Sequence, residues 1–133
     1  MTIKIALKKV DPGDMDFLYE LHNDPNIRKY FHQRKKFTYA EHIDYWNYRL
    51  NTRSFTAKII QVGGIPVGCV RREDKLISIA ILPSYQNKGI ARDVLKRFCK
   101  SGDEAEIYFD NATSLRLFNE SGFIPRWVRA VKK

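Results

Sequence analysis

The chain has 133 residues, of which 44% are hydrophobic and 29% charged, and this suits one folded domain of ordinary soluble composition. No apolar run approaches the roughly 20 residues of a membrane helix, and the N-terminus lacks the apolar core of a signal peptide, which predicts a cytoplasmic protein. The net charge of +9 favours anionic partners. Cys69 and Cys99 stand in apolar patterns without a CxxC pair, so we expect buried thiols.

The N-terminal part is predicted to hold one strand and two helices. Apolar and charged residues alternate over 3–9, as in a half-buried strand. Asp14 is expected to cap a helix whose apolar face lies within 17–21, and the polar run 23–26 ends or kinks that helix. Thr38-Tyr39-Ala40-Glu41 has the spacing of a capping box, which predicts a second helix after it.

The rest is predicted as a three-stranded meander followed by alternating helices and strands. Antiparallel strands are expected at 55–62, 67–71 and 76–82. An amphipathic helix over 90–100 follows, then a strand over 104–110, a helix after Asn111, and a last short strand over 127–131. The strand–helix–strand unit that spans 76–110 predicts parallel pairing with a right-handed crossover.

The turn over 83–92 joins an apolar strand directly to a helix. The first amides of a helix have no internal partner and lie at the positive end of its dipole, so they form an anion site. Gly89 allows close approach of the backbone to a phosphate, Ala91 is small, and Lys88 and Arg92 add positive charge. The P-loop pattern GxxxxGK[ST] and the dinucleotide pattern GxGxxG are both absent from the sequence.

Two motifs of this region carry a family resemblance. Gln86-x-x-Gly89-x-Ala91, after a strand ending Ile81-Leu82-Pro83, resembles the cofactor loop of the GNAT superfamily of acyl-CoA N-acyltransferases. The helix motif from Asn111 to Gly122-Phe123 is similar to the next motif of that superfamily. The resemblance implies an α/β fold, with a central mixed β-sheet flanked by helices and a splay between strands 4 and 5, in a single domain over 1–133. It also implies acetyl-CoA as the cofactor and an amine as the acceptor.

The same resemblance implies which positions hold the cofactor. Backbone groups of the fourth strand would bond to the pantetheine arm, and main-chain amides of the turn would hold the pyrophosphate. Two residues of the next helix would lie near the pantetheine and at the thiol end. These positions are Ile79 and Ile81, then Gln86, Asn87, Lys88, Gly89, Ile90, Ala91 and Arg92, and finally Asn111 and Phe118. From residue preference alone, a plain helix N-cap is the better explanation of Asn111.

Glu106 and Tyr108 are the candidate catalytic residues. Resemblance to alanine N-acetyltransferases of ribosomal proteins implies Glu106 as the general base, and a carboxylate desolvated in the splay is a stronger base. The alternative is a surface carboxylate on a half-exposed strand. Many relatives have a tyrosine where this chain has Phe118, which has no hydroxyl, so Tyr108, Tyr85 or a water is the candidate acid.

The acceptor side is expected near the first helices. The stretch from His22 to Tyr30 is similar to amino-sugar N-acetyltransferases of bacterial nonulosonate biosynthesis, which implies acceptor contacts from Arg28, Tyr30 and His32. Basic residues there could meet a diphosphate, and aromatic residues could stack on a base. The alternative is that the aromatic residues are core and the basic ones solvated. The histidines lack the spacing of zinc ligands, so we expect no metal.

Three functions remain open at this level. The first is an N-acetyltransferase that uses acetyl-CoA to modify a nucleotide-linked amino sugar, a peptide or protein amine, or a small metabolite. The second is a degenerate GNAT module that binds CoA without turnover, which Phe118 would favour. The third is a small basic nucleic-acid-binding domain, for which no recognisable motif is present. We expect no membrane partner, nucleic acid is the least favoured partner, and a homodimer stays open.

Overall fold

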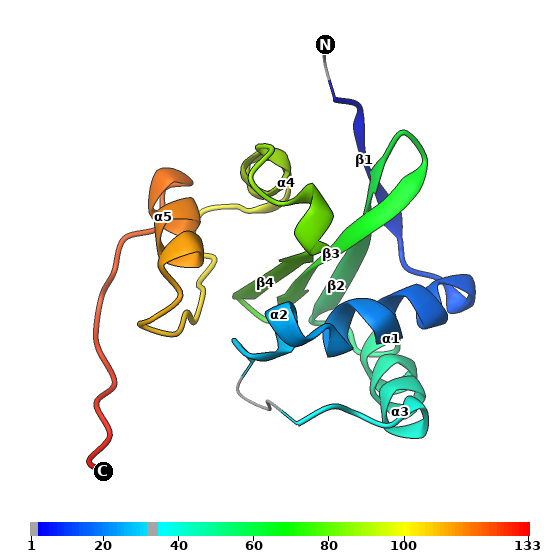
Figure 1. Ribbon diagram of the computed structural model, residues 1–133, viewed down its shortest axis with the longest axis horizontal. Helices are drawn as coiled ribbons and strands as arrows, with labels where there is room; N and C mark the ends of the chain where they lie inside the picture. The colour runs from blue at the N-terminus through cyan, green and yellow to red at the C-terminus, as the bar shows by residue number, and fades with distance from the viewer. Residues whose placement is uncertain (1–2, 32–34) are drawn as a thin grey trace.

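The computed structural model describes residues 3–31 and 35–133, with a four-stranded sheet at its centre (Figure 1). The strands lie in sequence order, and each pairs antiparallel with the next. They are β1 (Ile5–Lys9), β2 (Phe55–Val62), β3 (Ile65–Glu73) and β4 (Leu76–Ile81). The helices are α1 (Met15–Asn23), α2 (Pro25–Arg28), α3 (Tyr39–Leu50), α4 (Ile90–Phe98) and α5 (Ala112–Glu120), with 3-10 turns at Pro12–Asp14 and Pro83–Tyr85.

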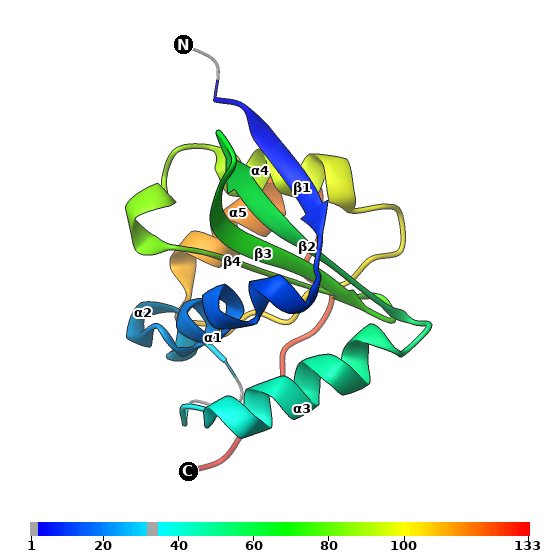
Figure 2. The same cartoon turned by 90° about the vertical axis from the view of Figure 1, so that its right-hand side faces the viewer.

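Helices cover both faces of the sheet, so the strands contribute to two apolar cores (Figures 1 and 2). On one face α1 and α3 bury Leu18 and Trp46 together with Cys69 of β3. On the other face α4 buries Val94 against Val70. Cys69 and Val70 are neighbours in one strand and point to opposite cores, as alternate strand residues do. Burial on both faces explains why the predicted strands are nearly continuous apolar runs.

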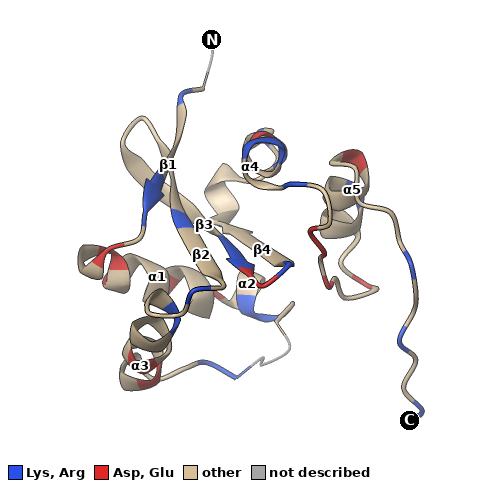
Figure 3. Ribbon diagram, turned by 180° about the vertical axis from the view of Figure 1, so that it is seen from behind, with Lys and Arg blue, Asp and Glu red and all other residues tan. Residues whose placement is uncertain are grey.

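Charge is distributed unevenly over this frame (Figure 3). The sequence over 27–38 has five Lys and Arg and no acidic residue: Arg28, Lys29, Arg34, Lys35 and Lys36. The segment 103–110, between α4 and α5, has four acidic residues and no basic one: Asp103, Glu104, Glu106 and Asp110. The net charge of +9 is therefore not evenly spread: 27–38 is basic and 103–110 is acidic.

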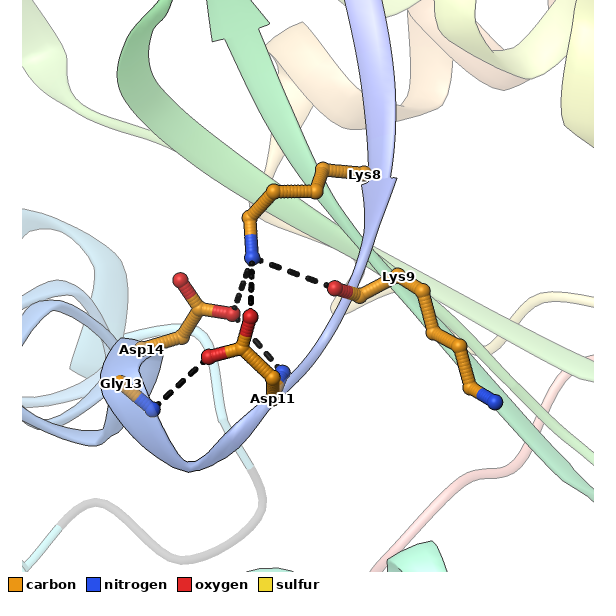
Figure 4. Close-up of polar contacts among 5 residues, drawn as sticks. All are labelled: Lys8, Lys9, Asp11, Gly13 and Asp14. Atoms are coloured by element: carbon orange, nitrogen blue, oxygen red, sulfur yellow. Dashed lines mark hydrogen bonds and ion pairs between the residues drawn. The ribbon is translucent and has the colours of Figure 1, made fainter.

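The turn from β1 into α1 is built by two aspartates and one lysine (Figure 4). The Asp11 carboxylate accepts from the Gly13 amide at 2.8 Å, and the Asp14 carboxylate accepts from the Asp11 amide at 2.9 Å. Lys8 donates to both carboxylates, which raises the pKa of Lys8 and lowers that of Asp11. The prediction that the Asp14 side chain caps α1 was wrong, because Asp14 instead closes the preceding 3-10 turn with Asp11.

The predicted capping box at the start of α3 is confirmed. Thr38 Oγ1 accepts from the Glu41 amide at 3.2 Å, and the Glu41 carboxylate accepts from the Thr38 amide at 2.9 Å. The helix then buries Trp46 to 1% exposure. His42 lies on the same side, and its Nε2 donates to the Met15 carbonyl at 2.9 Å, which ties α3 to α1.

The predicted strand over 104–110 pairs with the sheet through only one bridge. Leu76 and Glu104 form a single parallel bridge, in which the Ile77 amide donates to the Glu104 carbonyl at 2.7 Å. Beyond the bridge the chain diverges from β4 without strand structure. The predicted mixed sheet is therefore antiparallel in all four strands, with its parallel part limited to this bridge. Beyond Ile77 the outer edge of β4 therefore has no neighbouring strand among the described residues.

The predicted strand over 127–131 is not formed. Residues 124–133 are all described, and they are exposed and without regular structure. A strand needs a neighbouring edge to pair with, and the segment 104–110 that would supply one is itself irregular. Figure 1 shows this tail leaving α5 and running away from the sheet.

The helices are short in the part of the chain that the structure describes. The longest helix among residues 3–31 and 35–133 is α3, with 12 residues. No helix in these ranges is both long and apolar enough to cross a bilayer. Within the same ranges, no three His, Cys, Asp or Glu side chains are grouped closely enough to hold a metal ion.

Candidate active site

The turn between β4 and α4 presents its backbone to the outside. Asn87 and Gly89 both adopt the left-handed conformation, with φ of 61° and 80°. Left-handed residues among right-handed ones direct successive amides to one side, and the first amides of α4 have no partner inside the helix. A Cβ built on Gly89 would meet nothing within 4 Å, so the space beside this residue is open. Such an arrangement binds anions.

The outer edge of β4 carries backbone groups that point away from the sheet. The Ile77 amide points to this edge, because it donates to the Glu104 carbonyl. Backbone groups alternate along a strand, so those of Ile79 and Ile81 point to the same edge. The Ile81 carbonyl has a partner there: Gln86 donates to it from Nε2 at 2.8 Å. Gln86 thereby folds the turn back onto the strand end, a role that its motif does not reveal.

The other predicted cofactor residues of the turn differ in their surroundings. Ile90 is 1% exposed, so only its backbone can contact a ligand, and Ala91 packs partly against the same core. Arg92 forms an ion pair with Glu120 of α5. Lys88 lines an open cleft of about 420 Å³ together with Ile3, Val62, Ser84, Tyr85 and Ile90.

Asn111 and Phe118 both have structural roles in α5. Asn111 Oδ1 accepts from the Ser114 amide at 3.2 Å, so this residue is a helix N-cap. The cap uses the side-chain oxygen and leaves the NH2 group for other contacts. Phe118 is 5% exposed and packs edge-on against Phe123, with ring centroids 5.0 Å apart.

The two predicted catalytic residues lie on the segment that diverges from β4. Glu106 is exposed, so burial does not supply the desolvation that the sequence suggested. Tyr108 is half-buried, and its hydroxyl donates to the Phe31 carbonyl at 3.3 Å. This hydrogen bond joins the segment to the end of α2, so the two halves of the chain meet beside the open edge of β4.

Arg28, predicted as an acceptor residue, is 3% exposed. Its Nε donates to the His22 carbonyl at 2.9 Å, and its guanidinium carbon lies 4.4 Å from the ring centroids of both Phe31 and Phe37. Burial, and then the positive charge of Arg71, lower the pKa of Arg28. The guanidinium is thus held in one place by a carbonyl and two aromatic rings.

The other predicted acceptor residues are Tyr30 and His32. Tyr30 is half-buried, with the Lys29 ammonium 5.1 Å from its ring centroid. His32 lies outside the described residues. Phe31 contacts Arg28 through its ring and Tyr108 through its carbonyl. Phe31 therefore connects Arg28, a predicted acceptor residue, with Tyr108, a predicted catalytic residue.

A small pocket at this place involves a residue that the sequence analysis missed. The pocket has a volume of about 10 Å³, which is room for one water. Arg71 lines it, and Arg71 Nη1 donates to the Tyr45 hydroxyl at 2.8 Å. The sequence places Arg71 on the same strand face as Cys69, but it does not reveal the contact with Tyr45, which lies 26 residues earlier in the chain. The pocket is lined by His22, Phe31, Cys69, Arg71 and residues 78–80.

Both cysteines are free thiols. Burial raises the pKa of Cys69 to about 12 and that of Cys99 to about 11. Because the thiolate is the nucleophile, these raised pKa values disfavour a nucleophilic role for either side chain. The prediction of a buried thiol is confirmed for Cys69, whereas Cys99 is only partly buried.

Solved structures share this fold. The spermidine N-acetyltransferase of Vibrio cholerae, in complex with CoA and spermine, superposes with a TM-score of 0.80 at 21% identity, covering 92% of this chain and 82% of that one. An aminoglycoside acetyltransferase in complex with coenzyme A gives a TM-score of 0.73 at 17% identity, covering 92% and 86%. At these identities the likeness concerns the fold alone.

Sequence comparison extends the likeness to the family. Spermidine N(1)-acetyltransferase of Vibrio cholerae is 24% identical to this chain over 141 residues, covering 93% of this chain and 81% of that protein. Residues 15–123 match the model of the Acetyltransferase (GNAT) family. Because this match spans most of the chain, the protein belongs to the Acetyltransferase (GNAT) family, as an acetyl-CoA-dependent N-acetyltransferase.

Proposed function

We propose that this protein acetylates a primary amine by direct attack of the amine on acetyl-CoA within a ternary complex. The observation that carries the proposal is the outward-facing backbone of 86–92 at the end of the open edge of β4. Amides at a helix N-terminus bind phosphates, and a strand edge offers hydrogen bonds to an extended chain of amides. Coenzyme A contains both a diphosphate and such an arm.

The residues present fit this cofactor. The amides from Gln86 to Arg92 would hold the pyrophosphate, and Lys88 would add charge at its side. The backbone of Ile79 would bond to the pantetheine arm, since the Ile81 carbonyl is already engaged by Gln86. The Asn111 NH2 group would face the same arm, and Phe118 would provide an apolar wall near the thiol end.

Acetyl-CoA supplies a thioester, and the chain must supply groups that move protons. Glu106 would accept the amine proton, directly or through a water. Tyr108 would donate to the departing thiolate after releasing the Phe31 carbonyl, because Phe118 has no hydroxyl to do so. A thiol has a pKa near 8.5, so its thiolate leaves with modest assistance.

The proposed acceptor is the primary amine of a nucleotide-linked amino sugar, or of a peptide or protein, bound beside α2. Two of the similar proteins are named as spermidine acetyltransferases, and their acceptor does not follow for this chain. Because Phe118 has no hydroxyl, turnover with a panel of amines is a direct test of the proposal. Tight CoA binding with no acetylation of any amine would refute it.

The CoA site is tested by calorimetric titration of Gly89→Val. A Cβ at a φ of 80° is strained, and the strain would turn the amides away from the phosphates. Losing one charge-assisted hydrogen bond weakens binding by about 10- to 100-fold, and we expect at least this loss. Gly64→Val is the matched control, since Gly64 has a φ of 82° in open space in the β2–β3 turn. No heat with the folded wild type, or equal affinity in both variants, would refute the proposal.

A further inference from the structure

Two guanidinium groups and one imidazole gather around the small pocket beneath β4. Arg71 and His22 line the pocket, and Arg28 bonds to the His22 carbonyl. Burial lowers the pKa of His22 well below its ordinary value, and the nearby charges of Arg71, His42 and Arg28 lower it further. His22 is therefore neutral at neutral pH, and the positive charge at this place belongs to the two arginines.

Among the described residues, Arg71 has no carboxylate partner. β4, whose residues 78–80 line the pocket, has no charged residue. In the part of the chain that the structure describes, Arg71 forms no ion pair with a carboxylate. Among the described residues, Arg71 donates a hydrogen bond to the Tyr45 hydroxyl. A guanidinium has five N–H donors, so others are available for a ligand.

A half-buried guanidinium is normally paired, so Arg71 calls for an anion from outside the chain. We propose that Arg71, with Arg28 behind it, binds an anionic group of the acceptor, either a carboxylate or a phosphate. The pocket has room for one oxygen-sized group, so the anion would reach into it with one oxygen while the rest of the acceptor lies outside. Arg71 offers the fork geometry that both anions prefer.

The position of the pocket relates the anion to the reaction. This inference rests on the proposed function, because it takes the open edge of β4 as the place of acetyl transfer. Ile79 and Ala80 line the pocket, and Ile79 also presents its backbone to that edge. An acceptor held by its anion at Arg71 would therefore lie beside that edge. A polycation such as spermidine would meet like charge here.

The test is calorimetric titration of the CoA-saturated protein with three small amines. O-phosphoethanolamine carries a phosphate, β-alanine carries a carboxylate, and ethanolamine carries neither. We expect at least one of the two anionic amines to bind about 10-fold or more tightly than ethanolamine and spermidine. The anionic amine that binds more tightly identifies whether the site prefers a phosphate or a carboxylate. Equal or tighter binding of ethanolamine or spermidine would overturn the inference.

Variants assign the effect to Arg71. Arg71→Gln should reduce binding of the preferred anionic amine by about 10- to 100-fold. Arg71→Lys keeps the positive charge but not the planar guanidinium, so its affinity should lie between those of the wild type and Arg71→Gln. Arg53→Gln makes the same charge change at an exposed turn and should bind as wild type. Unchanged affinity in Arg71→Gln would refute the assignment, provided that thermal denaturation shows the variant folded.

The inference and the proposed function can fail separately. If CoA gives no heat, or if no amine is acetylated, the proposed function fails. The same three titrations without CoA then still decide whether Arg71 binds anions. If amines are acetylated with no preference for an anionic group, the proposed function stands and the anion site is wrong.

Discussion

Glu106 lies exposed on the segment that diverges from β4, and its exposure limits how it can act. A carboxylate in water is a weak base, so it would remove a proton best when the bound acceptor covers it.

Glu106→Gln is expected to lower kcat by about 10²- to 10⁴-fold, which is the usual contribution of a general base. The Kd of CoA should not change, because the side chain lies on the diverging segment and not on the turn over 83–92. Turnover is followed by release of the free thiol of CoA. Glu104→Gln, with the same charge change on the same exposed segment, is the control and should retain most of the activity. Equal losses in both variants would mean that only the segment's charge matters.

Single residues could be predicted where the residue type itself determines the local conformation. The capping box at Thr38 is such a case, because both hydrogen bonds are local. The turn at Gly89 is another, since only a left-handed backbone leads from β4 into α4. Asp14 was assigned wrongly because two aspartates compete for neighbouring amides. Arg71 was missed because its neighbours are distant in sequence.

The element that positions the site is the turn from α4 to Glu104, and one ion pair fixes it. Arg72 of β3 donates to both oxygens of Asp103, from Nε at 3.0 Å and from Nη2 at 2.8 Å. Nη2 also donates to the Phe98 carbonyl at 2.7 Å. The Asp103 side chain is 4% exposed. This contact holds the chain beside β4, just before the bridge between Leu76 and Glu104.

Asp103→Asn is expected to lower the free energy of unfolding by about 3 kcal/mol at pH 7, because it leaves a nearly buried guanidinium without its carboxylate. The hydrogen bonds from Arg72 lower the pKa of Asp103 below its ordinary value of 3.8. The stabilisation is therefore complete above that value and is lost as the pH falls through the lower, folded pKa. Urea unfolding of wild type and Asp103→Asn at a series of acidic pH values measures the difference in their free energies of unfolding.

The difference between wild type and Asp103→Asn should thus be constant near neutrality and shrink below about pH 4. Asp74→Asn removes an exposed carboxylate in the β3–β4 turn and serves as the control, with little effect at any pH. A difference that stays constant down to pH 2 would show that the Asp103 charge contributes nothing and that only its shape matters.

Elements could be predicted where the partner is adjacent in sequence. The strands at 55–62, 67–71 and 76–82 pair with neighbours through short turns, and each is present within a few residues of its predicted bounds. The segments 104–110 and 127–131 need partners that lie elsewhere in the fold, and neither forms a strand. Periodicity reports which face could be buried, whereas pairing depends on an available edge.

At the scale of the whole molecule, the two cores are complete without the C-terminal tail. The core opposite α1 and α3 ends with Phe118 and Phe123, and the residues after it are exposed. Ile124, Trp127, Val128 and Val131 are between 73% and 81% exposed, which is unusual for such large apolar side chains. In the structure they therefore add no burial to the free energy of folding.

Deleting residues 124–133 should leave the thermal stability nearly unchanged. The loss of exposed residues alters the free energy of unfolding by no more than about 0.5 kcal/mol, which corresponds to a Tm shift of about 3 °C or less. Phe118→Ala is the contrasting variant, because it empties a buried site and should cost about 3 kcal/mol or more. Scanning calorimetry compares the two, with light scattering to report the molecular mass. A large fall in Tm or a change in mass on deletion would mean that the tail packs in solution, against its own chain or a second copy.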